Sequence, residues 1–122
     1  MLDVLIVGAG LAGIGAACRL VEKCPQKEIA ILEAREEIGG TWSLFRYPGL
    51  RSDSDMFTFG YRFRPWQNPK LLSPAADIMQ YLHDTVADYG IKDKIRFGRE
   101  RGRDSRGACH ARARARMHAH MQ

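Results

Sequence analysis

The sequence predicts an α/β fold built on a parallel sheet, and three observations support that prediction. Two short apolar runs, residues 4–7 and 29–32, have the length and composition of buried strands. The stretch between them, from about Leu11 to Glu22, has a helical pattern, and strands that alternate with helices form parallel sheets. A glycine-rich turn joins the first strand to this helix. With 122 residues, the chain is one domain at most.

The turn after the first strand reads Gly8-Ala9-Gly10-Leu11-Ala12-Gly13. In a dinucleotide-binding turn, the first glycine permits the tight turn, the second lets a pyrophosphate approach the backbone, and the third lets the helix lie close to the sheet. The N–H groups of the first helical turn favour an anion there. Such glycines also occur for packing reasons alone, so the residues around them must support the interpretation. With the flanking strand and helix, they predict a Rossmann-type fold that binds FAD or NAD(P).

An acid ends the second strand. Glu33 follows Leu32, twenty residues after Gly13, where such folds place a ligand for the adenosine ribose. Its carboxylate would accept hydrogen bonds from the ribose hydroxyls and repel a 2′-phosphate, which suits FAD or NAD rather than NADP. The alternative is an ordinary surface glutamate. The run Gly39-Gly40-Thr41-Trp42, a few residues later, favours FAD.

The elements after residue 55 are scaffold in this interpretation. Aromatic residues alternate from Phe57 to Phe63, which predicts an extended segment that is half-buried on one side. Ser73-Pro74 and the apolar spacing that follows predict a capped amphipathic helix that ends at Gly90, with His83 on its solvated surface. Residues 95–97 resemble the start of a third strand.

The net charge of +5 lies entirely in the last part of the chain. Residues 1–98 hold 12 Lys+Arg and 12 Asp+Glu, whereas residues 99–122 hold seven arginines against two acids and no Ile, Leu, Val, Phe, Tyr or Trp. Such a stretch cannot form a core. We therefore expect residues 1–98 to be part of an FAD-binding domain and residues 99–122 to be a disordered tail.

Three interpretations of the tail remain open. It could be a basic arm that binds nucleic acid through phosphate contacts. Cys109, His110, His118 and His120 could bind a metal. We favour a third interpretation, a stretch read out of frame, because arginine, alanine, glycine and histidine without lysine are what GC-rich coding sequence gives in another frame. On this interpretation the chain has no metal site and binds no nucleic acid.

No segment is long and apolar enough to span a membrane, so no stable membrane anchor is expected. The three cysteines, Cys18, Cys24 and Cys109, form neither a paired framework nor a metal-binding spacing. These features favour a reducing compartment and a cytoplasmic protein.

A second informative segment runs from Gly39 to Asp55. It contains Phe-Arg-Tyr-Pro-Gly at residues 45–49 and Arg-Ser-Asp-Ser-Asp at residues 51–55, and Phe-Arg-Pro-Trp follows at residues 63–66. On these motifs, residues 2 to about 97 resemble the N-terminal part of class B flavoprotein monooxygenases, the Baeyer–Villiger and flavin-containing monooxygenases. The chain is most similar to the ethionamide-activating branch of that family.

The resemblance implies cofactor contacts in three places: the glycine-rich turn, the end of the second strand, and the segment beyond it. The FAD contacts so implied are Gly8, Gly10, Ala12, Gly13, Glu33, Gly40, Thr41, Trp42, Ser43 and Leu44. Asp53 matches a catalytic acid near the isoalloxazine, and Arg51, Ser52 and Asp53 lie where the nicotinamide cofactor approaches. Without the resemblance, a surface ion pair would be the better interpretation of Arg51 and Asp53.

The family uses NADPH to reduce the bound FAD, and then uses O₂ to oxygenate a small molecule at a ketone, sulfur or nitrogen. Its second glycine-rich fingerprint, its Phe-x-Gly-x-x-x-His motif and its later arginine are not in this chain. We therefore expect the chain alone to be inactive and much of its two main strands to stay exposed. The alternatives are another FAD- or NAD-dependent oxidoreductase, or a nucleic-acid-binding protein that uses its basic tail. The neutrality of residues 1–98 argues against the last.

Overall fold

The computed structural model describes residues 1–52, 55–69 and 72–99, and within them it shows the expected parallel sheet. The strands are β1 (Val4–Val7), β2 (Ile29–Leu32) and β3 (Ile95–Arg96), hydrogen-bonded in the order β1-β2-β3. β1 and β2 pair in parallel along their full length, and β3 pairs in parallel with the end of β2. The α/β prediction is confirmed.

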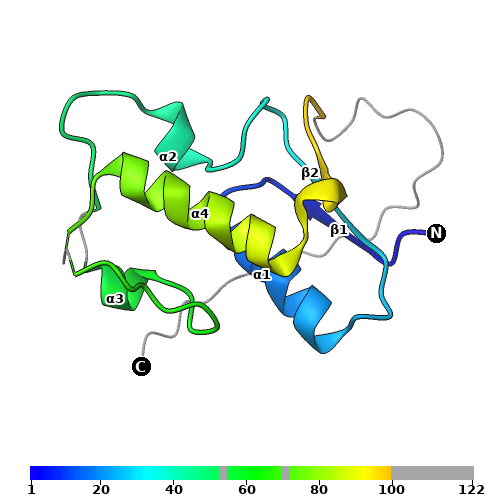
Figure 1. Ribbon diagram of the computed structural model, residues 1–122. Helices are drawn as coiled ribbons and strands as arrows, with labels where there is room; N and C mark the ends of the chain where they lie inside the picture. Colours follow the sequence, from blue (N-terminus) through cyan, green and yellow to red (C-terminus); the bar gives the residue numbers. More distant parts are fainter. Residues whose placement is uncertain (53–54, 70–71, 100–122) are drawn as a thin grey trace.

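Helix α1 (Leu11–Lys23) connects β1 to β2 (Figure 1). Its apolar positions face inward, and Ile14, Ala17 and Cys18 are fully buried in the core. The helix ends at Cys24, whose N–H donates to the Leu20 carbonyl at 2.8 Å. The crossover therefore returns the chain to the sheet beside the strand that it left.

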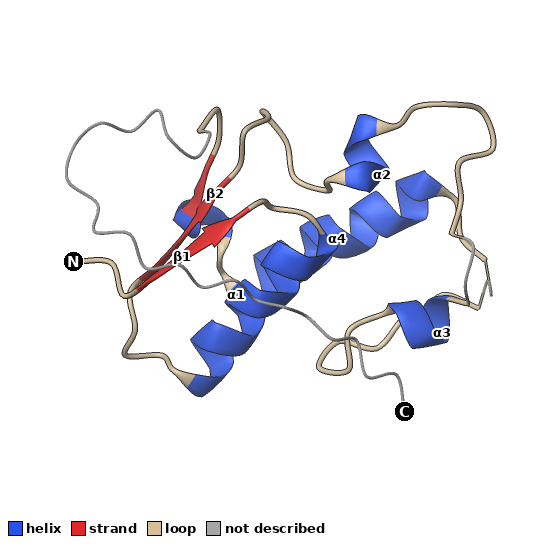
Figure 2. Cartoon of the chain, turned by 180° about the vertical axis from the view of Figure 1, so that it is seen from behind, coloured by secondary structure: helices blue, strands red, loops and turns tan. Residues whose placement is uncertain are grey.

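Helix α4 (Ala75–Tyr89) packs beside α1 on the same side of the strands (Figure 2). It ends at Gly90, which has the left-handed conformation that glycine adopts without strain (φ 63°), as the sequence predicted. At the N-terminal end of the helix the structure differs from the predicted capped start. Pro74 occupies the N-cap position, and no side chain caps the helix. His83 is exposed, as expected.

The prediction of an extended aromatic segment is wrong over its first part. Residues 56–59 form a short helix, α3 (Met56–Phe59), because Asp55 caps it by accepting a hydrogen bond from the Thr58 N–H at 2.9 Å. Two further short helices complete the described chain, α2 (Thr41–Leu44) and the 3₁₀ turn η1 (Lys92–Lys94).

The two main strands differ in burial. All four residues of β2 are buried, because β2 lies between β1 and β3. On β1, Leu5 and Val7 point away from the core and are 39% and 60% exposed. The expectation of extensive exposure is therefore correct for one face of β1 and wrong for β2.

The tail, predicted to be disordered, lies outside the described residues except for Arg99. In the described part of the chain, no helix has the length and apolar character needed to cross a bilayer.

Candidate functional site

A cavity of about 310 Å³ opens where the glycine-rich turn faces the segment after β2. One wall is the end of β1 with the first turn of α1, and the other is the Gly39–Trp42 segment. The Gly39 N–H donates to the Ala9 carbonyl at 2.9 Å and so ties the two walls together. The lining residues are Val7, Gly8, Gly10, Leu11, Ala12, Gly13, Gly39, Gly40, Thr41 and Trp42.

The glycines of the turn differ in what the fold requires of them. A Cβ on Gly13 would collide with the Gly8 carbonyl oxygen, so Gly13 is needed for close packing of helix on strand. A Cβ on Gly10 would meet the Gly40 backbone at ordinary contact distances, 3.7 Å to its Cα and 3.9 Å to its N. Protein packing therefore does not explain why residue 10 is glycine, whereas close approach of a ligand to the backbone does.

The start of α1 suits an anion. An α-helix leaves its first N–H groups without intrahelical acceptors, here those of Leu11, Ala12 and Gly13. The N-cap is Gly10, no side chain caps the helix, and the first turn holds no acidic residue. These donors border the cavity, as a pyrophosphate site requires.

Glu33 is 7% exposed, so it is not the surface glutamate that the sequence left as the alternative. Its Oε2 accepts a hydrogen bond from the Ala9 N–H at 2.7 Å, and its Oε1 accepts one from the Arg35 N–H at 3.0 Å. The carboxylate therefore lies directly behind the glycine-rich turn. Its two oxygens retain lone pairs that can accept ribose hydroxyls.

The segment after β2 divides into two parts. Thr41 and Trp42 line the cavity, and the Trp42 ring packs edge-on against Phe59 with centroids 5.7 Å apart. Ser43 is buried outside the cavity, where its hydroxyl donates to the Gly40 carbonyl at 3.2 Å, and Leu44 is 56% exposed. The structure brings Gly8, Gly10, Ala12, Gly13, Gly40, Thr41 and Trp42 to the cavity, and it leaves Ser43 and Leu44 beside it.

Two of the three residues expected to meet the nicotinamide cofactor, Arg51 and Ser52, are described by the structure. Arg51 is exposed, and its backbone forms an isolated antiparallel β-bridge with that of Pro74, the residue just before α4. Ser52 is buried; its N–H donates to the Ser73 carbonyl at 3.0 Å, and its hydroxyl accepts from the Ser73 N–H at 3.2 Å. Neither residue lines the cavity, and Asp53 lies outside the described residues. Their functional roles stay predictions.

One residue of the site was not predicted from the sequence. Arg35 donates from its guanidinium to Ser43 Oγ at 2.6 Å and to the Ser43 carbonyl at 3.3 Å. Nothing in the spacing distinguishes this arginine from a solvated surface residue, because its partners lie eight positions further along the chain.

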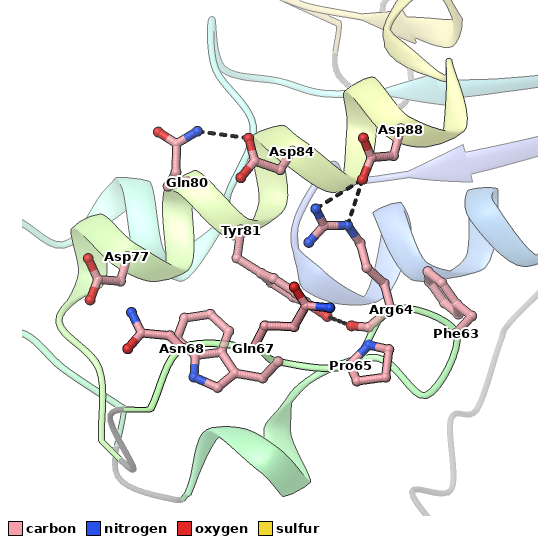
Figure 3. Close-up of a pocket in the computed structure, with 11 residues that line it drawn as sticks. Phe63, Arg64, Pro65, Gln67, Asn68, Asp77, Gln80, Tyr81, Asp84 and Asp88 are labelled. Carbon is pink, nitrogen blue, oxygen red and sulfur yellow. Dashed lines mark hydrogen bonds and ion pairs between the residues drawn. The ribbon is translucent and has the colours of Figure 1, made fainter.

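A second hollow, of about 580 Å³, lies between residues 63–68 and α4 (Figure 3). Its wall is held by an ion pair and a hydrogen bond. Arg64 pairs with Asp88 at 2.9 Å, and the Tyr81 hydroxyl accepts from the Tyr61 N–H at 2.9 Å. Burial raises the pKa of Tyr81 above its ordinary value, so this phenol stays protonated.

Among the described residues, no group of three His, Cys, Asp or Glu side chains could hold a metal ion.

Comparison with known families and curated proteins gives two results. The family model described as an NAD(P)-binding Rossmann-like domain matches residues 6–84. The chain is 60% identical over 96 residues to the putative FAD-containing monooxygenase MymA of Mycobacterium tuberculosis, covering 79% of this chain and 19% of that protein. It is 56% identical over 96 residues to the FAD-containing monooxygenase EthA of the same organism, covering 79% of this chain and 20% of that protein.

Solved structures agree with these relatives. The chain matches an oxidized steroid monooxygenase bound to NADP with a TM-score of 0.71 and 30% identity, covering 79% of this chain and 19% of that one. It matches OTEMO in complex with FAD and NADP with a TM-score of 0.70 and 27% identity, covering 80% of this chain and 19% of that one. The chain thus spans about a fifth of the length of the curated relatives that it matches.

Proposed function

Because the chain belongs to the NAD(P)-binding Rossmann-like domain family and its curated relatives are FAD-containing monooxygenases, we propose that it is the FAD-binding portion of a flavin-dependent monooxygenase. The observation that carries the proposal is the cavity at the glycine-rich turn. It combines an uncapped helix start with a glycine, Gly10, that the packing of the protein does not require.

The residues present fit FAD. The N–H groups of Leu11, Ala12 and Gly13 would hold the pyrophosphate, and Gly10 would let it approach the backbone. The buried carboxylate of Glu33 would accept the ribose hydroxyls. Thr41 and Trp42 would border the path of the cofactor towards its flavin. When bound, FAD supplies the redox and oxygen chemistry, and the protein supplies binding and orientation.

The complete reaction involves NADPH, O₂ and a small-molecule substrate that is oxygenated at a ketone, sulfur or nitrogen. Support comes from the names of the relatives and from the solved neighbours that hold NADP. We assign Asp53 as the catalytic acid, with Arg51 and Ser52 near the nicotinamide, on the family motif alone. We expect oxygenation to need parts of the relatives outside the 96 matched residues, so the chain by itself is proposed to be inactive.

The second candidate is another FAD- or NAD-dependent oxidoreductase. The matched family model favours it, since its description covers NAD(P)-binding domains in general. A carboxylate at the end of β2 suits NAD as well as FAD. Parallel titrations with the two dinucleotides separate these candidates, because the proposal requires tighter binding of FAD.

We propose a cytoplasmic, reducing compartment for the protein. Cys18 and Cys24 are both free thiols in the described chain, which agrees with the absence of a disulfide framework in the sequence.

The proposal is tested by titrating the purified chain and its Gly10→Ala variant with FAD and following flavin fluorescence. The added methyl group fits beside Gly40 but occupies the space of the pyrophosphate, so the variant should keep its helix content and lose at least about tenfold in affinity. Gly90→Ala adds the same group far from the cavity and should bind FAD like the wild type. Equal affinity in all three proteins would refute the proposed pyrophosphate site.

A further inference from the structure

The Gly39–Trp42 wall of the cavity is held by a side chain that does not line the cavity. The guanidinium of Arg35 donates to Ser43 Oγ at 2.6 Å, to the Ser43 carbonyl at 3.3 Å and to the Gly40 carbonyl at 3.5 Å. All three acceptors belong to α2 or to the glycine just before it. One planar group that bonds both ends of so short a helix fixes its position and its tilt.

The same residue also contacts the other part of the site. The backbone N–H of Arg35 donates to Glu33 Oε1 at 3.0 Å, while Glu33 Oε2 accepts from the Ala9 N–H at 2.7 Å. Arg35 therefore connects the carboxylate behind the glycine-rich turn with the segment on the opposite side of the cavity.

We infer that Arg35 is a positioning residue for the cofactor: it holds the Gly39–Leu44 segment at the separation from the glycine-rich turn that FAD requires, without touching FAD. The inference rests on the proposed function. In this arrangement Ser43 is the acceptor through which Arg35 holds the segment, rather than a direct contact to the cofactor.

A neighbouring arginine provides a matched control. Arg46 bonds Glu37 Oε1 at 2.9 Å and the Ser43 carbonyl at 3.4 Å, and its side chain is 75% exposed, against 35% for Arg35. The two residues carry the same charge close to the same helix. Of these two arginines, both of which the structure describes, Arg35 alone donates to Ser43 Oγ and to the Gly40 carbonyl.

The test compares the full chain with its Arg35→Met, Arg35→Lys and Arg46→Met variants by FAD titration and by amide hydrogen exchange without FAD. Arg35→Met should weaken FAD binding about tenfold or more, since it removes several hydrogen bonds to a charged group. It should also speed exchange at Leu44 and Phe45, whose N–H groups bond Gly40 and Thr41, but not in β2. Arg35→Lys should recover little of the FAD affinity, because one ammonium group cannot replace the several N–H donors of a planar guanidinium. Arg46→Met should behave like the wild type.

Each other outcome counts against a defined claim. Unchanged FAD affinity in Arg35→Met, with a wild type that binds, overturns the inference and leaves the proposed function intact. Faster exchange throughout β2 also overturns it, because Arg35 would then stabilise the whole fold. If the wild type binds no FAD, the proposed function fails for this chain, and exchange at Leu44 and Phe45 decides whether Arg35 holds the segment. Equal effects in Arg46→Met would show that the bonds specific to Arg35, to Ser43 Oγ and the Gly40 carbonyl, are not what holds the segment, and would overturn the inference.

Discussion

At the scale of single residues, burial separates the two cysteines of the described chain. Cys18 on α1 is fully buried among apolar side chains, whereas Cys24 at the helix end is partly accessible. Burial, with a smaller contribution from the Glu22 charge, raises the pKa of the Cys18 thiol to about 11. Since the thiolate is the reactive form, Cys18 is protected both by its position and by its protonation.

We predict that iodoacetamide at pH 8 labels Cys24 and leaves Cys18 unmodified until the protein is unfolded, as read by peptide mass spectrometry. The same raised pKa contributes stability that is complete below pH 9.0, the ordinary thiol value, and is lost as the pH rises towards about 11. The free energy of unfolding should therefore fall over that interval. Labelling of both cysteines at one rate in the native protein would contradict the buried position.

Residue roles set by local spacing could be predicted from the sequence, and roles set by distant contacts could not. The places of Gly8, Gly10 and Gly13 follow from a six-residue pattern, and the structure puts all three at the cavity. The family motif predicts Ser43 beside the cofactor, which stays a prediction, whereas the hydrogen bond that its hydroxyl accepts from Arg35 is seen only in the structure. That contact depends on how the loop after β2 folds back, which no local pattern records.

At the scale of elements, the sequence signals were reliable where a hydrophobic repeat was long. The repeat of α4 extends over four turns, and the helix and its C-terminal glycine were both located correctly. The aromatic alternation from Phe57 to Phe63 is misleading, because the hydrogen bonds that the Thr58 N–H and hydroxyl donate to the Asp55 carboxylate outweigh a short period-two pattern. Individual hydrogen bonds of this kind decide whether a short segment is helical or extended.

The end of α4 gives a prediction for Gly90, which has a φ of 63° and no heavy atom within 4 Å of the place that a Cβ would occupy, apart from its own and its chain neighbours' atoms. Gly90→Ala should lower the free energy of unfolding by about 1 kcal/mol, from the backbone conformation alone. Gly90→Asn should lose less, because asparagine tolerates the left-handed region. Urea unfolding of the three proteins measures both differences. A stability of Gly90→Ala equal to the wild type would mean that the helix can end in another conformation.

At the scale of the whole molecule, one buried cluster joins the described helices and strands. The buried cluster runs from Ala9 to Ile95 and joins α1, α4 and the sheet. The sequence could not predict how far β2 would be covered, because that depends on β3, a strand of only two residues. The exposed face of Leu5 and Val7 on β1 was expected from the small number of strands.

Because residues 100–122 contain no Ile, Leu, Val, Phe, Tyr or Trp that could add to a core, removing them should leave the thermal unfolding midpoint unchanged. Arg99 is kept in this deletion, since its N–H donates to the Glu33 carbonyl at 2.9 Å. The deletion removes six arginines and two acids, so it should also remove any retention of the chain on a DNA column at low salt. A lower midpoint would show that the tail contributes to the fold.

The peptide groups of Ala9 have a consequence for the thermodynamics of ligand binding. Its N–H is bonded to Glu33, its carbonyl is bonded to Gly39, and its side chain is fully buried. Fixing one residue of a mobile loop costs about 1–2 kcal/mol in conformational entropy. At Ala9 this ordering is completed when the protein folds, so a dinucleotide that enters the cavity meets a turn whose shape is already set.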